Sequence, residues 1–130
     1  MAALMKTLRG TLLPLVNTGG LAWLLHRVTG LALVAYLVPH FISINSARGG
    51  PAALDADLAY FNTPFFAAME WLLVGAVAFH ALNGLRIIAL DCFDLSGRQK
   101  WLFWLVLLAC GTVFLAASTL FVPRILGPVQ

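Results

Sequence analysis

The sequence predicts an all-α membrane protein with three transmembrane helices. Of its 130 residues, 62% are hydrophobic and only 10% are charged, and the mean hydropathy is +0.94. A soluble domain of this length is far more polar. Because a helix needs about 20 apolar residues to cross the hydrocarbon core of a bilayer, the chain has room for three crossings and little else. We therefore expect residues 1–130 to form one transmembrane domain.

The three crossings are expected at about residues 21–44, 64–90 and 101–122, and the third is an uninterrupted uncharged run. Residues 45–63 contain Gly49-Gly50-Pro51 and two aspartates, so we predict a loop there. The connection at 91–100 is short and polar. Residues 1–16 carry basic residues ahead of a short apolar patch broken by Pro14, and we expect a retained segment at the membrane surface.

Basic residues are distributed unequally between the two sides of the membrane. One side holds Lys6, Arg9, Arg27, Arg86, Arg98 and Lys100, and the other side holds Arg48 and Arg124. Cytoplasmic segments carry the excess of lysine and arginine, so this pattern predicts a cytoplasmic N-terminus. The net charge of +3 is explained by this topology signal, and no nucleic-acid partner is expected.

His80 lies in the middle of the second crossing. An imidazole at that depth needs a partner, and an ionisable residue inside a membrane is by default a candidate functional residue. A metal or a heme iron suits neutral imidazole best, and a hydrogen bond to a neighbouring helix is the alternative. Ala76 and Gly84 lie on the same face one turn away, which would let a flat macrocycle approach the backbone. Arg86, nearer the cytoplasmic end, is placed to meet a heme propionate or a lipid phosphate.

Two further histidines lie on the first crossing. His26 and His40 are 14 residues apart (40 − 26 = 14), close to four turns, so they project from nearly one face at roughly 21 Å spacing. The alternative for His26 and Arg27 is contact with lipid headgroups, and for His40 it is contact with water at the outer interface. Pro39 predicts a bend in the helix beside His40.

His40 and His80 are expected to differ in depth by roughly one to two helical turns. Two axial ligands of one heme need matched depths. If they ligate, each histidine is therefore expected to face a histidine of another polypeptide, with His80 at an inner heme and His40 at an outer one.

The remaining reactive side chains give weaker signals. Cys92 and Cys110 lie far apart with no Cys-x-x-Cys pairing, so we interpret them as packing thiols and expect no iron–sulfur ligands. Glu70, in the outer part of the second crossing, has no basic residue on its own helix face. It is protonated, reaches the outer interface or pairs with a partner subunit, and the sequence does not choose among these alternatives.

Two strings of residues carry a resemblance to a known family. They are Leu25-His26-Arg27-Val28-Thr29-Gly30 and His80-Ala81-Leu82-Asn83-Gly84-Leu85-Arg86, the second followed by Asp91. In this order and spacing they resemble the membrane-anchor cytochrome b subunits of succinate dehydrogenase and fumarate reductase (complex II). The similarity covers nearly the whole chain and is greatest to the larger of two small anchor subunits in bacterial enzymes.

The resemblance implies a heme-binding helical bundle of which this chain forms half and a companion anchor subunit the other half. It implies that His80 is an axial ligand of heme b, with the second ligand from the companion. It places Trp23, His26, Arg27 and Arg86 by the quinone pocket and the heme propionates, near the iron–sulfur subunit. In two-heme relatives a histidine late in the first crossing ligates the outer heme, and His40 falls at that place.

One position departs from the family pattern. Many ubiquinone-type relatives have a quinone-binding serine four residues before the arginine of the first crossing, and here that residue is Trp23. The serine contact is therefore not carried over, and the tryptophan favours a menaquinone-type or actinobacterial-like subgroup.

The expected function is that of a membrane subunit of succinate dehydrogenase in the bacterial cytoplasmic membrane. The subunit would bind lipids and dock a flavoprotein and an iron–sulfur subunit, and it would pass electrons to a quinone without catalysing succinate oxidation itself. Arg27 would polarise the quinone carbonyl and His26 would supply a proton. The alternatives are a heme b anchor of a fumarate reductase or another respiratory oxidoreductase, and a heme-free membrane scaffold.

Overall fold

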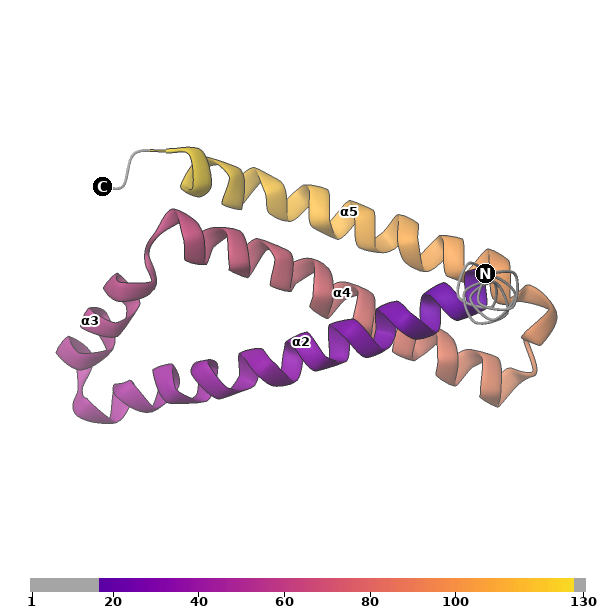
Figure 1. Cartoon of the computed structure of the whole chain (residues 1–130), viewed down its shortest axis with the longest axis horizontal. Coiled ribbons are helices and arrows are strands. Elements are labelled where there is room, and N and C mark those ends of the chain that lie inside the picture. The colour runs from indigo at the N-terminus through magenta and orange to yellow at the C-terminus, as the bar shows by residue number, and fades with distance from the viewer. Residues whose placement is uncertain (1–16, 128–130) are drawn as a thin grey trace, which may run out of the picture.

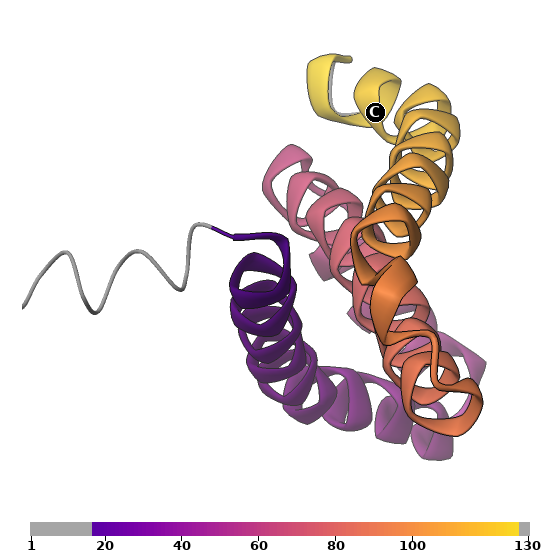
Figure 2. The same cartoon turned by 90° about the vertical axis from the view of Figure 1, so that its right-hand side faces the viewer.

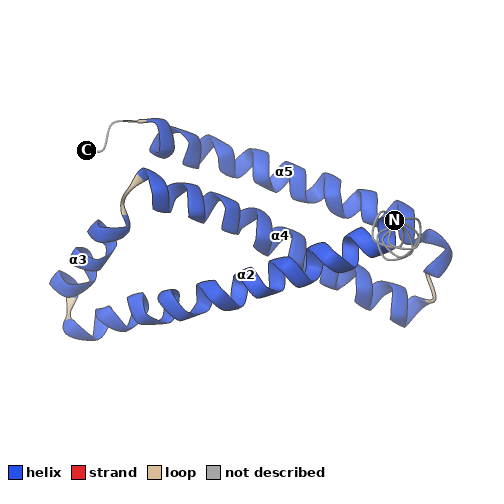
Figure 3. Cartoon of the chain, viewed as in Figure 1, coloured by secondary structure: helices blue, strands red, loops and turns tan. Residues whose placement is uncertain are grey.

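A computed structural model describes residues 17–127, and every regular element in that range is helical (Figures 1 and 3). In chain order the elements are α2 (Thr18–Ser46), η1 (Ala47–Gly49), α3 (Pro51–Phe61), α4 (Pro64–Phe93), η2 (Ser96–Arg98) and α5 (Gln99–Leu126). The all-α prediction is confirmed. The segment expected at the membrane surface, residues 1–16, lies outside the described residues.

The three expected crossings correspond to α2, α4 and α5. Each of the spans 18–49, 64–93 and 96–126 is long and apolar enough to cross a membrane. Large apolar side chains such as Leu31, Phe41 and Leu108 point outward. Outward apolar side chains are what a lipid-facing helix requires, because a membrane helix satisfies its own backbone hydrogen bonds and presents its side chains to hydrocarbon.

Local chemistry fixes where two of these helices begin. The Asn17 side chain accepts a hydrogen bond from the Gly20 amide at 2.8 Å and caps α2. Thr63 caps α4 by accepting from the Phe66 amide at 3.4 Å, and Pro64 follows at the first helical position. At the other end of α4, Asp94 adopts a left-handed conformation with φ 48° and ends the helix.

The loop predicted for residues 45–63 was wrong in its central part. Gly50, with φ 94°, turns the chain, and Pro51 follows at the first helical position of α3. The sequence after Pro51 is rich in alanine and leucine, which propagate a helix once it has started. A hydrogen bond from the Ser43 hydroxyl to the Asp57 carboxylate ties α3 to the end of α2.

Helix α2 crosses α4 near one end of the molecule and then diverges from it, whereas α4 and α5 run side by side (Figures 1 and 2). The buried apolar core lies at the end where all three helices meet, and it consists of Ala22, Phe79, Phe103 and Val106 with the partly buried Leu25, Leu82, Leu107 and Cys110. Pro39 lies inside α2, which continues past it as one helix to Ser46.

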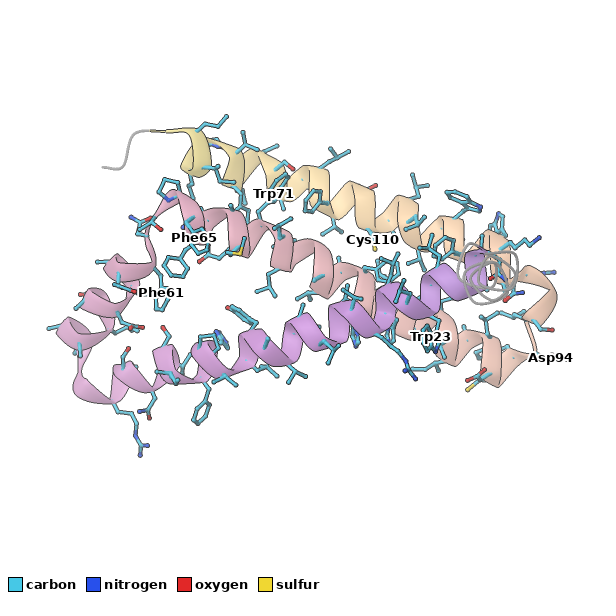
Figure 4. The ribbon with its side chains drawn as sticks, viewed as in Figure 1. Trp23, Phe61, Phe65, Trp71, Asp94 and Cys110 are labelled. Carbon is cyan, nitrogen blue, oxygen red and sulfur yellow. The ribbon has the colours of Figure 1, made fainter. Side chains whose placement is uncertain are left out.

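Polar and aromatic contacts join the first half of α4 to the second half of α5 (Figure 4). Trp71 stacks on Phe114 with ring centroids 4.5 Å apart, and its indole N–H donates to the Ser118 hydroxyl at 3.1 Å. Glu70 forms an ion pair with Arg124 at 3.1 Å. The partner that the sequence left open for Glu70 is therefore a residue of this chain, contributed by the neighbouring helix.

Gly75 provides a test of the packing between α4 and α5. A Cβ atom at this position would lie 3.1 Å from Cδ2 of Phe114, whose ring is already stacked on Trp71. We expect Gly75→Ala to lower the thermal denaturation midpoint of the solubilised complex, because overpacking of about 1–3 kcal/mol exceeds the gain of about 1 kcal/mol in helix propensity. Gly111→Ala is the matched control, because a Cβ there meets no atom within 4 Å. A midpoint in Gly75→Ala equal to that of the control would contradict this packing.

Candidate functional site

His80 projects from α4 to α2, and its environment fixes which ring nitrogen carries the proton. Its Nδ1 lies 3.1 Å from the backbone oxygen of His26 and 3.3 Å from the Thr29 hydroxyl. A carbonyl oxygen only accepts hydrogen bonds, so Nδ1 must donate. The Thr29 hydroxyl hydrogen is already directed to the Leu25 carbonyl at 2.8 Å, so this oxygen also acts as an acceptor for His80. The lone pair of the neutral imidazole is therefore on Nε2, for which no hydrogen-bond partner occurs among residues 17–127.

The ring of His26 stacks on the ring of His80. The two centroids are 4.0 Å apart, and the planes are inclined by only 8°. Gly30 makes room for the His80 ring, because a Cβ on Gly30 would lie 3.0 Å from Cε1 of His80. A Cβ on Gly84 would lie in ordinary contact, 3.5 Å from Cε1 of His26. Gly84, which we expected beside a macrocycle, thus faces a histidine of the same chain. His26 Nδ1 is buried and has no partner among the described residues.

Trp23 and Arg27 form a separate, outward-facing pair on α2 (Figure 4 labels Trp23). The guanidinium carbon of Arg27 lies 4.2 Å from the Trp23 ring centroid, a cation–π contact between positions one turn apart. Half of the Trp23 surface is exposed (50%), and Arg27 is exposed as well. The structure therefore divides the expected quinone group: His26 packs against α4, while Trp23 and Arg27 face away from the chain.

Arg86 lies between α4 and α5, where only 7% of its surface is exposed. One terminal nitrogen donates to the Gln99 backbone oxygen at 3.0 Å, and the other donates to the Asn83 side-chain oxygen at 3.4 Å. Phe79, Asn83 and Arg86 are the buried residues on one face of α4, spaced at four and three residues. This face turns inward, and the contact expected between Arg86 and a propionate or a lipid phosphate stays a prediction.

His40 lies on the exposed part of α2, away from the two stacked histidines. Its Nδ1 is 3.1 Å from the Tyr36 hydroxyl, and the two rings stack at 5.1 Å. A tyrosine hydroxyl donates or accepts, so this contact is compatible with either tautomer of His40. The histidine that contacts His80 is His26, and the Tyr36–His40 pair is a second, independent polar site.

Comparison with known proteins identifies the family. The family described as succinate dehydrogenase/fumarate reductase transmembrane subunit matches residues 11–117. This chain belongs to that family. The succinate dehydrogenase 2 membrane subunit SdhC of Mycobacterium tuberculosis is 37% identical over 100 residues, which cover 76% of this chain and 71% of that protein.

Two archaeal relatives of this transmembrane subunit are both named succinate dehydrogenase hydrophobic membrane anchor subunit. The protein from Archaeoglobus fulgidus is 37% identical over 71 residues, which cover 55% of this chain and 61% of that protein. The protein from Halobacterium salinarum is 29% identical over 108 residues, with coverages of 81% and 82%. The expected family and the multi-pass membrane character are confirmed.

Side chains that bind metals are scattered in this transmembrane subunit. Among residues 17–127, no three of the His, Cys, Asp and Glu side chains come together as a metal site. Cys92 is an exposed free thiol, and Cys110 is a free thiol packed against the core. A heme iron makes a smaller demand, because the porphyrin supplies four nitrogens and the protein supplies only axial ligands. A single histidine with a free lone pair fits that demand, and His80 is such a residue.

The contacts of His80 with Thr29, His26 and Gly30 were missed by the sequence analysis. A signal for them was present, because His26, Thr29 and Gly30 are spaced at three and four residues and so share one face of a helix. Tyr36, four residues before His40, was equally visible by spacing. What the sequence lacked was the pairing of that face of α2 with His80 of α4.

Proposed function

We propose that this chain is the heme b-binding membrane anchor of a succinate:quinone oxidoreductase and that it forms part of the quinone site. The observation that carries the proposal is the hydrogen bonding of His80: Nδ1 donates to the His26 carbonyl, and the lone pair remains on Nε2. Metal-ligating histidines generally donate their other ring N–H to a carbonyl or carboxylate, which fixes the tautomer and the ring orientation. The names of the relatives favour succinate dehydrogenase over fumarate reductase.

His80 would hold the heme iron through Nε2, and a companion anchor subunit would supply the ligand on the opposite face. When bound, heme b supplies a one-electron redox group in the membrane. His40 is the candidate for an outer heme, for which its exposed place on α2 leaves room. Arg86 has no part in this proposal, because its guanidinium holds α4 and α5 together.

Arg27 and Trp23 are the residues that we assign to the quinone. In the part of the chain that the structure describes, the one ion pair joins Arg124 and Glu70, so the charge of Arg27 is not neutralised by a carboxylate there. A cation in a partly dry site stabilises the negative charge that develops on a quinone oxygen during reduction. Trp23 offers a flat apolar surface beside that cation. His26 stacks on His80, so we assign it to packing the imidazole, in place of the proton transfer that we expected.

The orientation follows from the basic residues. The basic residues of this end of the bundle lie at the start of α2, at the end of α4, in η2 and at the start of α5: Arg27, Arg86, Arg98 and Lys100. Their excess supports the proposal that this end faces the cytoplasm of a bacterial cell. The iron–sulfur and flavoprotein subunits would dock on this face. Electrons would then enter the membrane at the end where α2 and α4 cross.

Purification of the intact complex through a tag on this chain tests the proposal. We expect the chain to co-purify with a flavoprotein that oxidises succinate, an iron–sulfur subunit and a second anchor subunit. We also expect a dithionite-reducible heme b band, with heme quantified per complex by its pyridine adduct. A complex isolated gently and free of heme would overturn the heme proposal, and a different soluble partner would indicate another respiratory oxidoreductase.

A further inference from the structure

We propose that the segment His26–Gly30 of α2 is a socket that orients the imidazole of His80, with Thr29 and Gly30 as its positioning residues. The inference rests on the proposed function, in which His80 ligates a heme iron. The family resemblance placed part of this segment by the quinone pocket and the heme propionates. The socket adds a role within the chain, which is to hold the His80 imidazole. Four contacts define the socket, and three residues supply them: the His26 carbonyl and ring, the Thr29 hydroxyl and the Gly30 backbone.

The first part of the socket binds the Nδ1 edge of the imidazole. The His26 oxygen is 3.1 Å from Nδ1 and also 3.1 Å from the Thr29 hydroxyl oxygen, which itself lies 3.3 Å from Nδ1. These three polar atoms are thus within hydrogen-bond reach of one another. Two acceptors share one N–H donor, so the ring is held in one tautomer. The backbone acceptor cannot be removed by substitution, but the hydroxyl can.

The second part of the socket limits rotation and translation of the ring. The His26 ring covers one face of the His80 ring at 4.0 Å and is nearly parallel to it. At the Cε1 edge, the α2 backbone approaches so closely that a methyl group on Gly30 would lie 3.0 Å from Cε1. This distance is below ordinary van der Waals contact. A side chain at position 30 would therefore require the imidazole to shift from its place.

The socket has an electronic consequence besides a geometric one. Acceptors at Nδ1 draw the proton toward themselves and make Nε2 a more basic ligand. A more basic axial ligand stabilises ferric over ferrous iron. Removing an acceptor should therefore raise the midpoint potential of the heme, a change that a purely structural role for Thr29 would not produce.

Thr29→Val tests the hydrogen-bonding part of the socket, because valine keeps the shape of threonine and removes the hydroxyl. We expect a positive shift of the heme b midpoint potential in a redox titration of the complex and altered low-spin EPR signals. Thr29→Ser should restore both to wild-type values. The matched control is Thr112→Val, since Thr112 is exposed on α5 and bonds only its own helix, at the Leu108 carbonyl (3.0 Å). A wild-type potential and EPR spectrum in Thr29→Val would overturn the hydroxyl's part.

Gly30→Ala tests the steric part of the socket. We expect displaced ligation, seen as a changed EPR signature or as substoichiometric heme in complexes that still contain all subunits. Gly111→Ala, on the open side of α5, should leave heme and EPR unchanged. If Gly30→Ala prevents assembly of the complex, the potentials and EPR spectra of Thr29→Val and Thr29→Ser test the socket. A wild-type spectrum in both Gly30→Ala and Thr29→Val would eliminate the socket. Full wild-type heme content in assembled His80→Ala would instead eliminate the proposed heme ligation on which the socket rests.

Discussion

Replacing His80 with alanine is expected to abolish the heme b ligated at the crossing of α2 and α4. The hydrogen bond from Nδ1 of His80 to a backbone oxygen fixes the tautomer in which the lone pair is on Nε2. Without His80, this chain would lack the imidazole that we propose as its ligand to the heme iron. Reduced-minus-oxidised spectra with heme quantification should show the loss, at unchanged content of the other subunits.

His40→Ala is the informative comparison for this variant. His40 lies on the exposed part of α2 beside Tyr36, far along the helix from His26. If His40 ligates an outer heme, the heme content of His40→Ala falls by half while the His80-dependent signal remains. If it does not, the content stays at the wild-type value, and the chain contributes to one heme only. Full heme content in assembled His80→Ala would contradict the assignment of the axial ligand.

The crossings were predictable because lipid imposes one simple demand on a helix. Apolar residues must fill a length of about 20 positions, and this pattern can be recognised without knowing which helices pack beside it. Helix α3 was not predictable in the same way, because Gly50-Pro51 was interpreted as loop chemistry. Glycine followed by proline also starts a helix, and the difference lies in the residues that come after Pro51.

The partners of polar side chains depend on how helices are rotated and staggered, which an apolar sequence specifies weakly. Arg86 was expected to face a ligand, but the face of α4 that carries Phe79, Asn83 and Arg86 turns to α5. Every face of α4 is rich in apolar residues, so hydropathy alone does not mark the buried one. The ion pair between Glu70 and Arg124 was missed for a related reason. It depends on how α4 and α5 are staggered, and that stagger is set by the short turn between them.

A short run of functional residues also does not show which group each of its side chains contacts. The string His26 to Gly30 was expected to serve the quinone and the propionates. In the structure its members divide between two faces of α2, with Arg27 outward and with His26, Thr29 and Gly30 against His80. One short helical string can carry two sites, because residues three or four apart share a face and their sequence neighbours point elsewhere. The identities of the residues were visible in the sequence, and the division between the faces was not.

The second large effect is expected from Arg27→Leu, which should lower the rate of quinone reduction by at least about tenfold. At enclosed sites, removing one donor that stabilises a developing oxyanion lowers the rate by about 10²–10³. The smaller figure reflects the exposed position of Arg27. Leucine keeps a comparable apolar stem against Trp23 and removes the charge. Succinate-dependent quinone reduction by the purified complex measures the effect, and Arg27→Lys should retain part of the rate.

Two controls separate a quinone effect from a general one. Electron transfer from succinate to a water-soluble dye is carried by the soluble subunits, so it should be unchanged in Arg27→Leu. Arg48→Leu removes another exposed arginine, on η1 near the opposite end of α2, and should reduce quinone at the wild-type rate. Arg27 neighbours His26 but contacts Trp23, so the heme spectrum should also be preserved. Wild-type quinone reduction in Arg27→Leu would place the quinone elsewhere, because no compensating cation lies within one turn of this position.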